Sequence, residues 1–155
     1  MEMPKPIPQH RKLEAFAGTW TGQEKMLPSP WDPKGGNAQG AITSRMDLDG
    51  MYLVSDYTQQ RDGKVTYRGH GVIGYDPKRE AYTMYWFDSM SYDTGGAALG
   101  RWESDTLTFE MKNPMGYSRY IYKLQGDGKY EFRMEMSQDG RNFQPWLEST
   151  WTRKK

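Results

Sequence analysis

Short segments joined by turn-forming dipeptides are the feature that most constrains how this chain can fold. Asp-Gly occurs at Asp49-Gly50, Asp62-Gly63, Asp127-Gly128 and Asp139-Gly140. This dipeptide favours tight hairpins, because both of its positions tolerate the positive φ that such turns require. Other turn-forming pairs are Asp76-Pro77, Gly95-Gly96, Ser104-Asp105 and Asn113-Pro114. The short spacing leaves no room for crossover helices, so neighbouring strands are expected to be antiparallel.

The segments between these turns alternate apolar and polar residues with period two, as a strand with one buried face does. Around position 132, one face would carry Tyr130, Phe132, Met134 and Met136. Ten strands are predicted, at about 19–27, 38–47, 51–60, 64–75, 80–88, 97–103, 106–112, 116–125, 129–137 and 146–153. A meander of this length closes on itself, which removes its exposed edges.

The expected fold is therefore all-β, an antiparallel up-and-down ten-stranded β-barrel with a short N-terminal helix. That helix is placed at 10–16, where Leu13 and Phe16 are three residues apart and would cover one barrel end. A single domain is expected over residues 1–155, with residues 1–9 as an extended proline-rich lead.

Composition narrows the class of partner. The chain has 11 Tyr, 6 Trp and 17 Gly, a mixture that favours strands and tight turns over helical bundles. Basic and acidic residues are mixed along it and sum to a net charge of +1, so neither nucleic acid nor an anionic membrane is an expected partner. There is no cysteine, no secretory signal pattern and no apolar stretch of membrane-spanning length, and a cytoplasmic location is expected.

Gly18 and Trp20 on the first strand and Arg153 on the last predict how the barrel closes. If these two strands pair, Trp20 would plug the base and the Arg153 guanidinium would lie over its indole. Such a cation–π contact contributes roughly 0.5–2 kcal/mol.

Gly18-Thr19-Trp20 followed by Gly22, together with a late Arg153, resembles the calycin superfamily, which includes lipocalins, fatty-acid-binding proteins and nitrobindin-like domains. An ordered set of motifs is similar to an uncharacterised bacterial family of lipocalin-like domains of unknown function. These motifs are Leu13-x-x-Phe16-x-Gly18-x-Trp20, Leu48-Asp49-Gly50, Gly71-x-x-Gly74-Tyr75-Asp76 and Trp86-Phe87-Asp88-Ser89. The resemblance implies a lipocalin-like barrel with a small-molecule cup.

The chain also departs from the named groups. Ser55-Asp56-Tyr57 lies in the third strand, not in the late loop where a lipocalin carries Thr-Asp-Tyr. The 28–37 connection is too short for the two lid helices of fatty-acid-binding proteins. Nitrobindin-like domains hold haem through a histidine near the C-terminus, and residues 148–153 contain none. No cofactor is therefore expected.

The sequence does not predict a metal site or a nucleophilic triad. Its two histidines, His10 and His70, lie sixty residues apart without cysteine, and no Gly-x-Ser-x-Gly motif occurs. His70 has two interpretations. The inward face of its strand would carry Tyr67, Gly69 and Gly71, with the glycines making space for a neighbouring ring, and His70 would then lie on the surface. Alternatively, Arg68 and His70 line the cavity as an anion-binding or acid–base pair.

The leading functional hypothesis is a binding protein for a small hydrophobic or amphipathic molecule. Glu24 shares the face of Trp20 and is either a polar anchor inside the cup, partnered by Arg or Tyr, or a solvated rim residue. Methionines on the strands either adapt to varied ligands or simply fill the core. The predicted ligand-binding wall consists of Trp20, Glu24, Met26, Tyr67, Trp86, Tyr120 and Met134.

Two alternatives use the same barrel. One is an enzyme that acts on a small hydrophobic substrate by general acid–base chemistry, with His70, Glu24 or Asp88 as catalytic residues. The other is a structural dimerisation domain. It follows from the strand at 80–88, where both the Trp86 face and the Tyr85 and Phe87 face are apolar, and it predicts a homodimer. Two long loops, at 28–37 with Trp31 and at 88–96 with Met90 and Tyr92, are expected at the barrel mouth.

Overall fold

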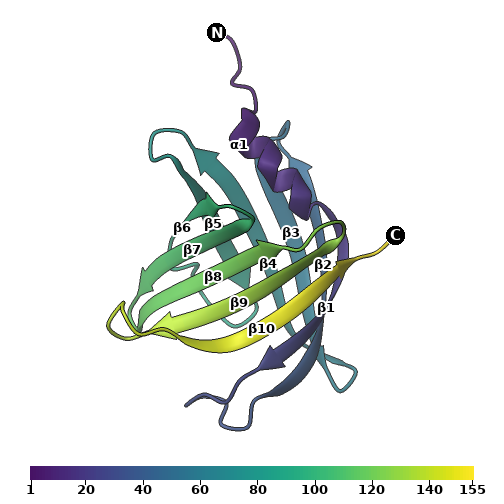
Figure 1. Ribbon diagram of the computed structural model, residues 1–155, viewed down its shortest axis with the longest axis vertical. Coiled ribbons are helices and arrows are strands. Elements are labelled where there is room, and N and C mark those ends of the chain that lie inside the picture. The colour runs from purple at the N-terminus through teal and green to yellow at the C-terminus, as the bar shows by residue number, and fades with distance from the viewer.

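Ten antiparallel strands close into a β-barrel, as the sequence predicts (Figure 1). The computed structural model describes residues 1–155. Each strand pairs with its neighbours in the chain, and β1 also pairs with β10. The strands are β1 (Gly18–Met26), β2 (Gly36–Asp47), β3 (Tyr52–Arg61), β4 (Lys64–Asp76), β5 (Ala81–Asp88), β6 (Ala98–Glu103), β7 (Thr106–Asn113), β8 (Gly116–Leu124), β9 (Lys129–Ser137) and β10 (Gln144–Arg153).

A short helical segment covers one end of the barrel (Figure 1). It consists of α1 (Pro8–Arg11) and a 3₁₀ turn (Lys12–Phe16), so it begins two residues earlier than predicted. Pro8 can start the helix because the first helical N–H needs no partner within the helix. In the 3₁₀ turn, positions three apart lie on the same side. Leu13 and Phe16 are both buried as a result, and they close that end against the core.

Trp20 and Arg153 join the two ends of the chain as predicted. They are directly opposite in the β1–β10 register, and the Arg153 guanidinium carbon lies 4.5 Å from the Trp20 ring centroid. The indole N–H donates a 2.9 Å hydrogen bond to the carbonyl of Phe16, and Arg153 Nη2 donates one of 2.8 Å to the carbonyl of Ala15. The last strand is therefore fastened to both the first strand and the helical cap.

The inward face of β4 is the one predicted from its glycines. The Trp86 indole from β5 lies against Gly69 and Gly71, where a β-carbon would collide with the ring at Gly69 and crowd it at Gly71. His70, between them in the sequence, therefore points outward. Alternation along the strand thus places a large ring inside the barrel and the histidine outside it.

The strand pairing is shortest between β5 and β6. Only Tyr82–Met84 pairs across this seam, with Ala98–Gly100. Tyr85–Asp88 extends beyond it and pairs with β4 alone.

No helix in the structure is both long and apolar enough to cross a lipid bilayer.

Candidate functional site

A cavity of about 450 Å³ opens at the end of the barrel opposite the helical cap. Sixteen of its 22 lining residues are hydrophobic, and the lining comes from β1 to β5, β8 to β10 and the β1–β2 loop. Its rim includes Trp31, in the connection that follows β1, and Arg61 and Asp88, the last residues of β3 and β5. The volume lies within the range of small-molecule sites, roughly 300–1,000 Å³. The interior is therefore not filled solid by side chains.

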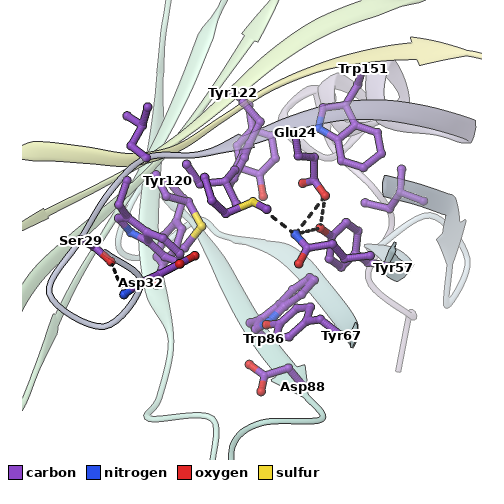
Figure 2. A pocket seen from close by; sticks show the side chains of 18 of the residues that line it. Glu24, Ser29, Asp32, Tyr57, Tyr67, Trp86, Asp88, Tyr120, Tyr122 and Trp151 are labelled. Atoms are coloured by element: carbon purple, nitrogen blue, oxygen red, sulfur yellow. Dashed lines mark hydrogen bonds between the residues drawn. The ribbon is translucent and has the colours of Figure 1, made fainter. Parts of the chain in front are cut away.

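A buried polar cluster of Glu24, Tyr57 and Gln59 lies within this otherwise apolar cavity (Figure 2). Glu24 is only 4% exposed. Its Oε2 accepts a 2.5 Å hydrogen bond from the Tyr57 hydroxyl and a 3.1 Å bond from Gln59 Nε2. Gln59 Nε2 also lies 3.1 Å from the Tyr57 oxygen, so the three side chains form one network. Glu24 is thus inside the cavity with a tyrosine partner. Of its two predicted positions, inside the cavity or at the solvated rim, the structure has the first.

Burial governs the acid–base chemistry of this cluster. It raises the pKa of Glu24 above its ordinary range, and the hydrogen bonds from Tyr57 and Gln59 only partly offset that effect. Burial also raises the pKa of Tyr57, and the nearby Glu24 carboxylate raises it further. The Tyr57 hydroxyl therefore stays protonated and acts as a hydrogen-bond donor.

Small residues on β1 and β2 allow the cluster to form. Gly40 on β2 lies between Glu24 on β1 and the β3 residues, and a β-carbon at Gly40 would lie 3.0 Å from Glu24 Oε2. The Trp151 indole from β10 packs over Gly22 and Gly40, whose missing side chains leave room for it. Tyr57 and Gln59 can consequently reach across β2 to the carboxyl group.

Aromatic rings surround the polar cluster. The Tyr57 ring centroid lies 5.9 Å from those of Tyr67 and Trp86 and 6.0 Å from that of Trp151. The Trp86 indole N–H donates a 2.7 Å hydrogen bond to the Tyr67 hydroxyl, and the two rings are stacked. These bonds hold the rings in place, so the apolar wall is largely preformed.

The loop between β1 and β2 borders the mouth. Ser29 and Asp32 pair with each other, and Arg61 at the end of β3 holds Asp32 through a 3.3 Å ion pair. The Trp31 ring lies 5.8 Å from that of Trp146. This loop therefore forms part of the rim, as predicted. Of the residues predicted at the mouth in 88–96, only Asp88, the last residue of β5, lines the cavity, whereas Met90 and Tyr92 are exposed and lie outside it.

Most of the residues predicted for the wall do line the cavity. They are Glu24, Met26, Tyr67, Trp86, Tyr120 and Met134, and the predicted acid–base candidate Asp88 joins them.

Two predicted site residues lie elsewhere. Trp20 faces inward but is packed under the helical cap, 1% exposed, and does not reach the cavity. His70 lies on the outer surface, where its Nδ1 is 2.6 Å from Asp56 Oδ1 and its side chain is 66% exposed. The interpretation that placed His70 inside as a catalytic group is therefore wrong.

Tyr57, Gln59 and Trp151 line the cavity but were absent from the predicted wall. Alternation along β3 could have placed Tyr57 and Gln59 on one face, and the glycines opposite Trp151 could have indicated space for its ring. No group of three or more His, Asp or Glu side chains is arranged to hold a metal ion.

Solved structures share the fold over almost the whole chain. One is Rv2717c from M. tuberculosis, with a TM-score of 0.68 at 14% identity, covering 96% of this chain and 99% of that one. Another is the S-type phycobiliprotein lyase CPES from Guillardia theta, with a TM-score of 0.69 at 9% identity, covering 96% and 94%. No curated protein matches the sequence. Residues 5–153 match the model of a family described as a protein of unknown function (DUF1579), and the chain belongs to that family.

Proposed function

We propose that this barrel is a lipocalin-like, calycin-type binding protein for a small, largely apolar molecule with one polar group. The observation that carries the proposal is the 450 Å³ aromatic cavity with a single buried polar cluster at Glu24. Apolar area would supply most of the binding free energy, and the few fixed polar groups would orient the ligand. The rings are already held by hydrogen bonds, which lowers the entropic cost of binding.

Native mass spectrometry of the protein purified from its own host tests this proposal. The expected spectrum shows the chain with one small molecule bound in a one-to-one ratio. Replacing Met134, a half-buried cavity residue, with tryptophan should remove the added mass by filling the space. The matched control is Glu131→Trp, at an exposed position on the same strand. An adduct that survives Met134→Trp unchanged would place the ligand outside the cavity.

A second candidate function is supported by the convergence of Glu24, Tyr57 and Gln59 at one void. Burial raises the pKa of the Glu24 carboxyl group, and in its protonated form this group can serve as a general acid towards a substrate beside it. Hydrolysis of p-nitrophenyl octanoate by wild type and Glu24→Gln tests this function. An enzyme of this kind would turn over the ester and lose most of its rate in the variant, and equal rates in the two proteins exclude Glu24 as the acid.

We also propose that the protein forms a homodimer through the outer face of β5. Tyr85 and Phe87 are 43% and 47% exposed there, although both are large aromatic residues. Exposed aromatic patches commonly mark interfaces. Light scattering should give twice the 18.0 kDa chain mass, and Phe87→Asp should return it to the single-chain value. A single-chain mass for wild type at micromolar concentration would contradict the dimer.

A further inference from the structure

The charges that line the cavity are mostly negative. Three carboxyl groups, from Glu24, Asp32 and Asp88, face it, and the only cationic side chain is Arg61. Arg61 is held at the rim by Asp32, so it is already neutralised. No lysine or histidine lines the cavity. An anionic ligand such as a fatty acid would therefore meet no unpaired positive charge, only further carboxyl groups.

Glu24 retains an oxygen for a ligand. Both hydrogen bonds that it accepts go to Oε2, while Oε1 has no partner in the protein. Oε1 is also not among the fully buried polar atoms without a partner. Figure 2 shows the carboxyl group between Trp151 and Tyr57, at the edge of the open space. A carboxylate in this apolar setting is costly unless an opposite charge or a donor reaches it.

The rings around Glu24 suit a positive charge. Tyr57, Trp86 and Trp151 all line the cavity. The Tyr57 ring centroid lies about 6 Å from the centroid of each of the other two rings. Aromatic faces carry negative electrostatic potential, and a desolvated cation over such a face gains stabilisation. Rings and carboxylate together form the type of cage that recognises ammonium groups.

We propose that the cavity takes an organic amine, with its ammonium group between Glu24 Oε1 and the rings of Tyr57, Trp86 and Trp151 and its apolar remainder directed towards the mouth. This inference rests on the proposed binding function and names the class of ligand. An alcohol or acid of the same length fills the same apolar space but does not supply the missing positive charge.

Amine binding is coupled to the proton on Glu24. Burial raises the pKa of Glu24, so the empty site holds a neutral carboxyl group over part of the pH range above the ordinary value. An incoming ammonium favours the carboxylate, and the Glu24 proton leaves to solvent. No other cation competes at this position. The inward neighbours on β2 and β10 are uncharged, and β3 supplies Tyr57 and Gln59, with Arg61 only at the rim. The other ionisable groups that line the cavity are all acidic or phenolic: Asp32, Tyr67, Asp88, Tyr120, Tyr122 and Tyr130.

Isothermal titration of the whole protein with three matched probes tests the inference: octylamine, 1-octanol and octanoate. These probes share an eight-carbon chain and carry a positive, neutral or negative head near neutral pH. Octylamine is expected to bind about tenfold or more tighter than octanol, with octanoate weakest. Its affinity should rise with pH while Glu24 ionises, and one-to-one binding should release a proton to the buffer.

The outcomes separate the two levels of the proposal. If octanol or octanoate binds as tightly as octylamine, the cavity is a binding site but the amine inference is overturned. If none of the three probes binds, the proposed binding function fails as well, and the inference with it.

A variant pair assigns the preference to its residue. Glu24→Gln should bring octylamine to within about threefold of octanol and abolish proton release, while octanol binding is retained. Glu148→Gln makes the same change at an exposed position of β10 and should leave the preference intact. An unchanged preference in Glu24→Gln would overturn the role of Glu24. The wild-type series with its pH dependence remains decisive if the variant does not fold.

Discussion

Trp20 and Arg153, at opposite ends of the chain, face each other across the β1–β10 pair with the guanidinium 4.5 Å from the indole centroid. Arg153 also donates a 2.8 Å hydrogen bond to the carbonyl of Ala15. One side chain thus ties the last strand to the first and to the cap. The cavity at the far end depends on this closure, because β1 and β10 supply Glu24 and Trp151.

Removing this tie should destabilise the barrel. Arg153→Ala loses both the cation–π contact and the hydrogen bond, so the free energy of unfolding should fall by about 2–3 kcal/mol. Urea denaturation followed by tryptophan fluorescence measures the change. Arg101→Ala, at an exposed position of β6, is the control and should change stability by less than about 0.5 kcal/mol. Equal stabilities for the two variants would show that Arg153 does not hold the ends together.

The glycines under Trp86 give a graded prediction. A β-carbon at Gly69 would collide with the indole, whereas one at Gly71 would lie 3.3 Å from it. Gly69→Ala should therefore cost about 1–3 kcal/mol of stability and displace Trp86 into the cavity, with a much smaller effect for Gly71→Ala. Thermal melts report the loss of stability, and the change in total tryptophan emission relative to wild type reports the displacement of the indole. Equal melting temperatures for both variants would contradict the described packing.

Glu24 should make the protein less stable as pH rises, whereas a carboxylate held in an ion pair makes a protein more stable as pH rises. Because its folded pKa is raised, the folded state holds the proton more tightly than the unfolded state. Above the ordinary value of 4.5, stability is therefore lost as pH rises towards the folded pKa. Glu24→Gln should be more stable than wild type near neutral pH by about 1–2 kcal/mol, with the difference shrinking towards pH ~4. A difference that is constant with pH would mean that Glu24 titrates normally.

His10 predicts a second pH dependence, at the opposite end of the barrel. The ring is 3% exposed, and its Nδ1 accepts a 3.1 Å hydrogen bond from the backbone N–H of Ile7. Burial lowers the pKa of His10 from 6.5, so below that pH the unfolded state binds a proton that the folded state resists. Stability should fall as pH decreases from 6.5 through the folded pKa of His10.

Urea denaturation across this range, in wild type and in His10→Gln, isolates the effect. The variant should lack the component of the slope due to His10, whereas His70→Gln, at the exposed histidine, should keep it. If the slope is the same in wild type and His10→Gln, the buried histidine has no part in it.

The fold could be predicted because its signals are local. Asp62-Gly63 shows this directly, since both residues have positive φ and join β3 to β4 as a two-residue hairpin. Alternation likewise separated the inside of β4 from the outside, and the glycines at 69 and 71 decided which was which. The helix boundary was missed because Pro8 was interpreted as part of an extended lead, although proline is also a favoured first helical residue.

The site could be predicted only in part, because alternation gives the direction of a side chain and not its depth along the barrel. Trp20 was assigned to the wall for this reason, although it lies at the closed end. The network at Glu24 depends on how far β3 is shifted against β1 across β2. That shift follows from the β1–β2 and β2–β3 pairing registers, which are properties of the closed barrel.

The most direct test of the central claim is fluorescence titration with N-phenyl-1-naphthylamine, a neutral apolar dye. Wild type and the exposed-face control Glu131→Trp should bind one dye per chain saturably, and Met134→Trp should bind it about tenfold or more weakly. No saturable binding by wild type, or equal binding by all three proteins, would contradict a ligand cavity inside the barrel.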